Sequence, residues 1–363
     1  MALRYPSPLS IALLLLCGLL FCAGSCSADD GGAPRRIVVI GDVHGDLPQL
    51  MAVLQMCDVI DRSGRWIGNR TTTVVQVGDL LDRGPHDKEV MDFFINLKTD
   101  AMRYGARVVN LIGNHELMNL ASEFHYVHPE SNEAFGGKNK RRHAFALDGL
   151  YGQLLTNFPV VHVESRTLFV HAGLLPVYAK LGVKALNDKA HRALSSGDFR
   201  NKLFGTDGPI WTRLMITDAT NGRCSDVEET LRILDVDRMV VGHTPQRSGR
   251  LGSFCDDKIL AVDVGLSKWM YGKLAALEIT VLDTDGRNVE LREVLPRKAG
   301  NVAKGQGDAA KEDDEEDGGG AGAEGEAAVR NDPMLLQEML DLLHEYEGRK
   351  KKSASPSEHK DEL

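Results

Sequence analysis

The chain has 363 residues, 42% hydrophobic side chains and a formal net charge of −9. Its length allows one large domain or two ordinary ones, and its hydrophobic content is sufficient for a sizeable core. The acidic balance argues against general nucleic-acid binding, and most of it lies in a tail, since residues 305–330 hold nine acidic and two basic side chains.

Residues 1–28 have the pattern of a secretory signal peptide. Arg4 precedes an apolar run over residues 9–21, and small residues such as Ala23 and Ala28 follow it. The run is short for a bilayer span, so cleavage near residue 28 is expected, and no membrane span remains in the mature chain. An uncleaved membrane anchor is the alternative.

Strand-like and helix-like stretches alternate between residues 34 and 297. Short runs rich in β-branched residues predict strands at 37–40, 74–77, 108–112, 168–170, 239–241, 259–264, 274–282 and 289–294. Helical periodicity covers 47–57 and 88–104. This order predicts an α/β domain over 34–297 with two packed β-sheets flanked by helices. Residues 122–142 lack a clear period and are predicted to form a surface insertion or lid. Arg141, Arg142 and His143 are expected in a solvated charge cluster, and the alternative is that they face the phosphate.

The remaining chain is predicted to form a tail with three parts. Residues 305–331 are an acidic low-complexity linker that cannot bury enough apolar surface to fold. Residues 333–348 have the spacing of an amphipathic helix, which either docks on its own domain or binds a partner. Residues 360–363 read Lys-Asp-Glu-Leu, the endoplasmic-reticulum retrieval signal. Together with the signal peptide, this tetrapeptide predicts the endoplasmic-reticulum lumen as the location and a retrieval receptor as a partner.

Three cysteines, Cys57, Cys224 and Cys255, lie in the predicted domain. The lumen permits disulfides, and Cys224 with Cys255 is one possible pair, but core or free thiols are equally compatible with such scattered positions. Asn69 begins an Asn-Arg-Thr glycosylation sequon that is expected on a surface loop.

Five polar motifs directly follow predicted strands. They are Gly41-Asp42-Val43-His44-Gly45, Gly78-Asp79-Leu80-Leu81-Asp82-Arg83-Gly84, Gly113-Asn114-His115-Glu116, His171-Ala172-Gly173-Leu174 and Gly242-His243-Thr244. Loops at strand ends are the usual position of a site in an α/β protein, and the glycines permit close approach to a metal or a phosphate.

In this order, the five motifs resemble the phosphoprotein phosphatase family of calcineurin-like metallophosphoesterases. The continuation to Leu117-Met118-Asn119 and the later Gly208-Pro209-Ile210-Trp211-Thr212-Arg213 are most similar to the Shewanella-like protein phosphatase branch. The resemblance covers roughly residues 35–294. It implies a metal-dependent enzyme that hydrolyses phosphomonoesters of protein substrates.

The same resemblance implies two metal ions. The first set of ligands would be Asp42, His44 and Asp79, and the second would be Asp79, Asn114, His171 and His243, so that Asp79 bridges the pair. Mixed carboxylate, amide and imidazole ligands suit manganese, iron or zinc. Two such cations about 3.5–4 Å apart can share a hydroxide that attacks phosphorus directly, without a phosphoenzyme.

The resemblance leaves four residues for proton transfer and phosphate binding. His115 would donate a proton to the leaving oxygen, oriented by Asp82. Arg83 would bind the phosphate with its planar fork. Arg213 would be a second phosphate-binding arginine, and an ordinary surface arginine is the alternative for that position.

The sequence is compatible with more than one class of substrate. No Ser-Ala-Pro-Asn-Tyr-type segment, which shapes the cleft in the main Ser/Thr branches, follows His243. Both phosphoserine or phosphothreonine and phosphotyrosine are therefore compatible with the sequence. The alternative function is hydrolysis of dinucleoside polyphosphates or other small phosphates at the same metal site. A third hypothesis is a binding module with a degenerate metal site that acts through its tail helix.

Overall fold

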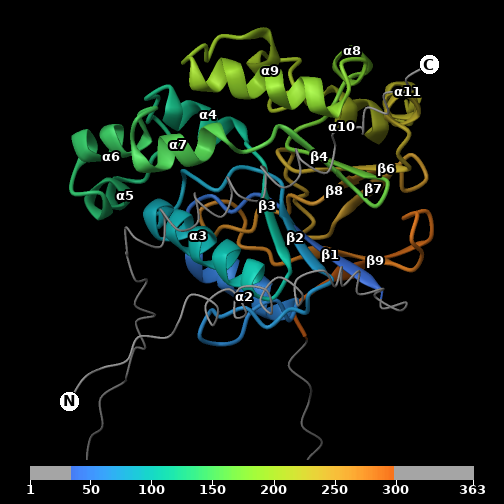
Figure 1. The fold of residues 1–363 in the computed structure, drawn as a ribbon, viewed down its shortest axis with the longest axis horizontal. Coiled ribbons are helices and arrows are strands. Elements are labelled where there is room, and N and C mark those ends of the chain that lie inside the picture. The colour runs from blue at the N-terminus through green and yellow to red at the C-terminus, as the bar shows by residue number, and fades with distance from the viewer. Residues whose placement is uncertain (1–33, 298–363) are drawn as a thin grey trace, which may run out of the picture. The chain divides into compact units, whose positions relative to one another are not determined.

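The computed structural model describes residues 34–297, and strand β1 (Arg35–Ile40) lies at the middle of its first sheet (Figure 1). Because successive side chains of a strand point to opposite faces, Ile37 enters one hydrophobic core and Val38 enters another. The core that holds Ile37 also receives Phe169 and Val240, which belong to the second sheet. This core therefore lies between two sheets, and the predicted α/β fold of two packed sheets is confirmed.

The first sheet has the strand order β10-β9-β1-β2-β3. Its other strands are β2 (Thr72–Gln76), β3 (Arg107–Asn110), β9 (Ala276–Val281) and β10 (Val289–Val294). The first three strands of the chain run parallel to one another, whereas β9 pairs antiparallel with both β1 and β10. The last two strands of the described residues thus join the sheet that begins with β1, and β9 and β10 form an antiparallel pair at the positions predicted for the last two strands.

The second sheet has the order β4-β5-β6-β8-β7. Its strands are β4 (Val161–Glu164), β5 (Thr167–Val170), β6 (Arg238–Val241), β7 (Gly252–Phe254) and β8 (Ile259–Ala261). The central strands β5, β6 and β8 are parallel, and an antiparallel strand covers each edge. The predicted strands occur close to these bounds, and only β4 and β7 were not expected.

Helices surround the two sheets (Figure 1). They are α2 (Leu47–Met56), α3 (Asp87–Arg103), α4 (Asn114–Leu120), α5 (Pro129–Ala134), α6 (Lys138–Phe145), α7 (Leu150–Thr156), α8 (Pro176–Ala179), α9 (Val183–Ser195), η1 (Lys202–Phe204), α10 (Leu214–Thr220) and α11 (Ser225–Leu234). Within residues 34–297, none of these helices has the length and hydropathy needed to cross a bilayer.

Residues 122–142 do form a surface excursion, but they are more ordered than their sequence indicates. They contain α5 and most of α6, and Arg141 is completely buried. The expectation that Arg141 belongs to a solvated charge cluster is therefore wrong. Arg142, its neighbour, is exposed as expected.

The three cysteines within residues 34–297 divide into one disulfide pair and one free thiol. Cys224 and Cys255 form a disulfide with a Cα–Cα distance of 5.7 Å, and Cys57 is buried. The open question about this pair is thereby answered in favour of the bridge. The predicted signal peptide, acidic linker, amphipathic helix and retrieval tetrapeptide all lie outside the described residues.

Candidate metal centre and active site

The five motif loops leave the carboxyl ends of β1, β2, β3, β5 and β6, and their backbones are unusual. The angle φ is 48° at His44, 58° at Asp79, 70° at Asp82, 73° at Arg83 and 63° at His243. Side chains other than glycine rarely adopt this left-handed region, and where they do the surrounding structure must hold them there. Such positions concentrate at functional sites. These five residues with left-handed φ angles are all residues that the sequence singled out.

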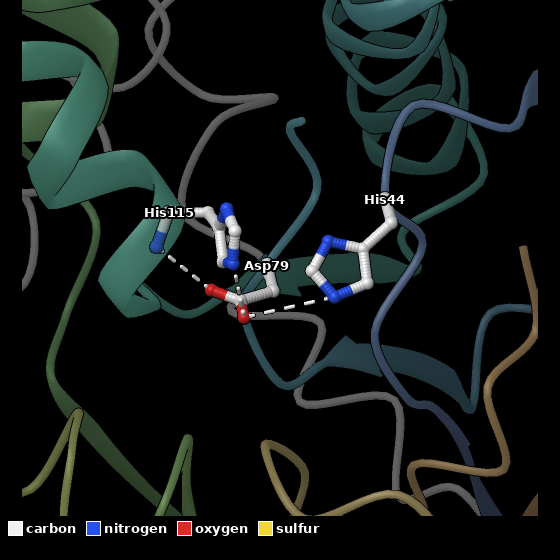
Figure 2. A group of neighbouring side chains, drawn as sticks. All are labelled: His44, Asp79 and His115. Carbon is white, nitrogen blue, oxygen red and sulfur yellow. Dashed lines mark hydrogen bonds and ion pairs between the residues drawn. The ribbon is translucent and has the colours of Figure 1, made fainter. Parts of the chain in front are cut away.

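Asp79 lies at the centre of the cluster. Figure 2 shows its carboxylate between the rings of His44 and His115. Its Oδ2 atom is 3.9 Å from Nε2 of His44 and 3.9 Å from Nε2 of His115. Its Oδ1 atom is 3.3 Å from Nε2 of His171. Two groups of potential ligand atoms share this carboxylate, and the second group extends to His243. Asp79 is thus common to both groups, and its role as a bridging ligand stays a prediction.

Hydrogen bonds to backbone carbonyls orient two of the imidazoles. Nδ1 of His44 is 3.1 Å from the carbonyl oxygen of Leu81, and Nδ1 of His171 is 2.9 Å from that of Val77. A carbonyl oxygen only accepts, so in both rings Nδ1 carries the hydrogen. In the neutral ring the lone pair is therefore on Nε2, which points into the cluster. A second partner of this kind is typical of metal-binding histidines.

A second observation concerns Asn114. Its Oδ1 atom is 3.0 Å from Nε2 of His171. With a neutral His171 both atoms would be acceptors, so this orientation of the Asn114 amide suits a cation or an additional proton beside the two atoms. Burial lowers the pKa of His171, but the Asp79 carboxylate outweighs burial and raises the pKa above its ordinary value. A proton can thus occupy the place that a cation would take, which is how metal binding comes to release protons.

Further potential metal-ligand atoms are buried and lack hydrogen-bond partners among the described residues. Nε2 of His243 and Oδ2 of Asp263 have no hydrogen-bond partner within the described part of the chain. Burial lowers the pKa of His44 to about 4 and that of His243 to about 3, so both rings are neutral at pH 7. Burial, together with the nearby Asp263 and Asp79, raises the pKa of Asp42. Neutral imidazoles beside closely spaced carboxylates suit cations, because bound positive charge would offset the repulsion between the carboxylates of Asp42, Asp79 and Asp263.

His115 forms the second part of the site. Its Nδ1 is 2.7 Å from Oδ2 of Asp82, and Oδ1 of Asp82 accepts a 3.0 Å hydrogen bond from Nδ2 of Asn119. Burial lowers the pKa of His115, but Asp79 and Asp82 outweigh it, and the pKa is raised. The carboxylate behind the ring suits a proton donor. Because Nε2 of His115 lies as close to Asp79 as that of His44, the geometry is also compatible with a ligand, and the role as acid stays a prediction.

The two predicted phosphate-binding arginines have different neighbours in the cluster. The guanidinium carbon of Arg83 is 4.2 Å from the ring centroid of Tyr126, and this ring lies 5.3 Å from the His115 ring. Nη1 of Arg213 donates to the carbonyl oxygen of His243 at 2.9 Å and to Oγ1 of Thr244 at 3.2 Å. Arg213 is exposed beside a predicted ligand rather than remote from the site. Tyr126 was not singled out from the sequence.

Arg141 supports the His115–Asp82 pair from behind. Its Nη2 atom donates to Oδ2 of Asp87 at 2.8 Å and to Oδ1 of Asn119 at 2.6 Å, and it lies 3.7 Å from Oδ1 of Asp82. Asp87 in turn accepts a 2.8 Å hydrogen bond from the backbone N–H of Asp82. A buried cation is thus paired with buried acceptors behind the reaction centre.

Two further residues were missed by reasoning from the sequence. Glu116 is completely buried, and its carboxylate accepts hydrogen bonds from the backbone N–H groups of Asp79, Leu80, Leu81 and Gly113. It belongs to the third motif, but no role follows from the motif alone. Asp263 follows β8 as a single acidic residue with no glycine-rich motif around it. The only available signal was its position at the end of a predicted strand.

Comparison with known proteins identifies the family. A family model described as calcineurin-like phosphoesterase matches residues 35–247. The chain belongs to this family. It is therefore a member of a group of metal-dependent phosphoesterases, as the motif order predicted, and the candidate metal cluster lies within the matched residues.

Similar proteins extend this assignment. The chain is 31% identical to Shewanella-like protein phosphatase 1 of Plasmodium berghei, over 64% of this chain and 67% of that protein. It is 30% identical to Shewanella-like protein phosphatase 2 of Arabidopsis thaliana, over 65% and 72%. Among solved structures, a cold-active protein tyrosine phosphatase of a psychrophilic Shewanella species matches with a TM-score of 0.61 and 26% identity, over 72% of this chain and 81% of that one. The predicted resemblance to the Shewanella-like branch is confirmed.

Proposed function

We propose that this protein is a binuclear-metal phosphatase that hydrolyses phosphomonoesters of polypeptides, with phosphotyrosine as the preferred residue. The observation that carries the proposal is the position of Asp79 between two groups of imidazoles, with the His115–Asp82 pair on one side. Asp42 and His44 would hold one cation, Asn114, His171 and His243 the other, and Asp79 both. Bound cations would activate water and offset the charge of the phosphoryl oxygens.

The protein's own groups perform the remaining tasks. Arg83, beside Tyr126, and Arg213, beside His243, would orient the phosphate through charge-assisted hydrogen bonds. His115, held by Asp82, would donate its proton to the leaving oxygen of the side chain. Removal of His115 would therefore matter more for a poor leaving group than for a good one.

Aromatic side chains at the rim support the preference for phosphotyrosine. Tyr126 is 39% exposed beside His115, and the partly exposed Trp211 lies 6.0 Å from the ring of His243. A phosphotyrosine ring held between such groups would gain stacking contacts that a phosphoserine side chain cannot make. The similar Shewanella structure carries the name of a tyrosine phosphatase, which favours the same preference.

One substrate panel tests the proposal. The metal-free protein is loaded separately with manganese, iron or zinc and assayed with peptides that differ only in phosphotyrosine, phosphoserine or phosphothreonine. A dinucleoside tetraphosphate completes the panel. We expect the phosphotyrosine peptide to be cleaved fastest, two metal ions per chain at full activity, and no activity for Asp79→Ala. Faster cleavage of the dinucleotide would replace the proposal with its alternative.

We further propose that the enzyme acts in the endoplasmic-reticulum lumen. The apolar run at residues 9–21 and the tetrapeptide at residues 360–363 are the sequence basis. The Cys224–Cys255 disulfide supports an oxidising compartment. Asn69, in the sequon, is exposed and therefore accessible to glycosylation.

A further inference from the structure

A cavity of about 360 Å³ lies in the excursion formed by residues 122–142. Its lining includes Phe124, Asn132, Lys138 and Arg142, but no acidic side chain. The cavity is half open to solvent, so a ligand can enter it without rearrangement of the fold. None of the five motifs contributes to this lining, which makes the cavity separate from the cluster around Asp79.

The two cations of the cavity are available for a ligand. Lys138 and Arg142 are exposed and form no ion pair with any residue that the structure describes. The guanidinium of Arg142 lies 5.9 Å from the ring centroid of Phe124, which holds the charge over the cavity. Acidic residues occur nearby at Glu130 and Glu133, but neither belongs to the lining. The cavity is therefore suited to a carboxylate or another anion.

Asn132 favours a ligand that supplies a hydrogen-bond donor in addition to a negative charge. Its side chain is 8% exposed, and its Oδ1 atom has no hydrogen-bond partner among residues 34–297. A buried acceptor without a donor is costly, so a ligand that brings an N–H group would be favoured. A fully deprotonated inorganic anion such as sulfate offers negative charge but no hydrogen-bond donor. A peptide offers both, because its backbone supplies N–H groups and an acidic side chain supplies the charge.

The cavity is close to the reaction centre along the chain. Phe124 and Val127, which line it, flank Tyr126 on the same loop, and Tyr126 contacts both Arg83 and His115. Two residues of extended chain span at most about 7 Å. If the phosphorylated residue of a peptide lies at Arg83, another residue of the same peptide, no more than about four positions away, would therefore reach the cavity.

We infer that the cavity lined by Lys138, Arg142 and Asn132 is a substrate subsite that binds an acidic residue of the polypeptide near the phosphorylated residue. This inference rests on the proposed protein phosphatase activity and specifies the sequence context that the enzyme selects. The two cations recognise the carboxylate of the acidic side chain. Asn132 Oδ1 accepts from a backbone N–H of the same segment.

The test is a phosphopeptide scan. In an otherwise neutral phosphotyrosine peptide, glutamate or glutamine is placed at each of the four positions on either side of the phosphorylated residue. The readout is the ratio of kcat/KM for the glutamate peptide to that for its glutamine counterpart. For the wild type we expect a ratio of about ten at one or two positions, since two partly exposed ion pairs together supply roughly one power of ten. Ratios near one at every position would overturn the inference.

Variants assign the preference to the cavity. Lys138→Glu with Arg142→Glu should lower the ratio below one, whereas the matched reversal Lys140→Glu, on the same helix but outside the lining, should keep the wild-type ratio. An acidic preference that survives the double reversal, or that Lys140→Glu abolishes equally, would overturn the assignment. Turnover of p-nitrophenyl phosphate separates the two proposals. If neither this compound nor any peptide is cleaved, the phosphatase proposal fails and takes the subsite with it, whereas uniform peptide cleavage contradicts the subsite alone.

Discussion

The carboxylate of Glu116 accepts a 2.8 Å hydrogen bond from the backbone N–H of Asp79, so a side chain of the third motif holds the central residue of the second. The same carboxylate also binds the backbone N–H groups of Leu80 and Gly113. The left-handed turn at Asp79 thus depends on an acceptor that offers several lone pairs at once. Glutamine has one acceptor oxygen and would present an N–H₂ group to these donors.

Glu116→Gln should therefore weaken metal binding without removing a ligand. We expect a loss of about 10- to 100-fold in metal affinity, the usual effect of changing a partner of the ligands. Titration of the metal-free variant with metal, with activity as the readout, measures this loss. Excess metal should restore much of the rate. Glu123→Gln, an exposed change just after α4, is the control. Unchanged metal affinity in Glu116→Gln would contradict the role of this carboxylate.

Asp82→Asn should separate proton donation from metal binding at His115. Loss of the 2.7 Å charged partner leaves the imidazole less basic and less well oriented. For a tyrosine phosphate we expect kcat to fall about 100-fold, the lower range of general acid catalysis. With p-nitrophenyl phosphate, whose leaving group needs little protonation, the loss should be much smaller. Metal content by elemental analysis is the second measurement, because a lost metal ion would identify His115 as a ligand instead.

The disulfide should contribute substantially to stability. Cys224 and Cys255 are 31 positions apart, and closure of a loop of this length in the unfolded chain corresponds to about 3–4 kcal/mol. Replacing both cysteines with serine should lower the free energy of unfolding by that amount in urea titrations. A reductant should destabilise the wild type and leave the double variant unaffected. Equal sensitivity of both proteins would show that the bridge is not the cause.

The ion pairs of Glu278 make stability depend on pH. This carboxylate on β9 accepts from Nε of Arg36 on β1 at 2.6 Å and from Nη2 of Arg292 on β10 at 2.6 Å. Burial opposes ionisation, but Arg292 and Arg36 outweigh it and hold the pKa of Glu278 below its ordinary value. Because the pKa is lower in the folded state, the stabilisation is complete above the unfolded pKa, about 4.3, and is lost as pH falls through the folded pKa.

Glu278→Gln should accordingly cost about 2 kcal/mol at pH 7, as expected for hydrogen bonds to a charged group. Urea unfolding at a series of pH values measures the difference from the wild type. This difference should shrink below about pH 4.3, where the unfolded carboxylate becomes protonated. Glu290→Gln is the matched control, since Glu290 lies exposed on β10 and forms no ion pair among residues 34–297. A difference that does not vary with pH would contradict the account.

Glycosylation tests the proposed location. In the endoplasmic-reticulum lumen, the exposed Asn69 should carry a high-mannose glycan. Protein expressed from the full chain in eukaryotic cells should then gain mobility on gels after endoglycosidase H treatment, and Asn69→Gln should remove this shift. A wild-type protein that is insensitive to the enzyme and unmodified at Asn69 would contradict the lumenal location.

The strands and the gathering of the five motifs at strand ends were predictable, because each motif directly follows a short apolar run rich in β-branched residues. The position of Arg141 was not, since its partners Asp87 and Asn119 lie 54 and 22 positions away and nothing in α6 distinguishes Arg141 from Arg142. Asp263 was missed for a similar reason. It affects Asp42, more than 200 positions earlier, and only the packing of two sheets brings them together.

That packing has a consequence for how the protein can be assayed. The backbone N–H of His243, which follows a strand of the second sheet, lies 3.2 Å from the carboxylate of Asp42, which follows a strand of the first. Cations bound between these loops would fasten the two halves of the domain to each other. Folding would then be linked to metal concentration, with about 1.4 kcal/mol of added stability for each tenfold excess over the Kd. The melting temperature would report how fully the site is loaded, in the absence of any substrate.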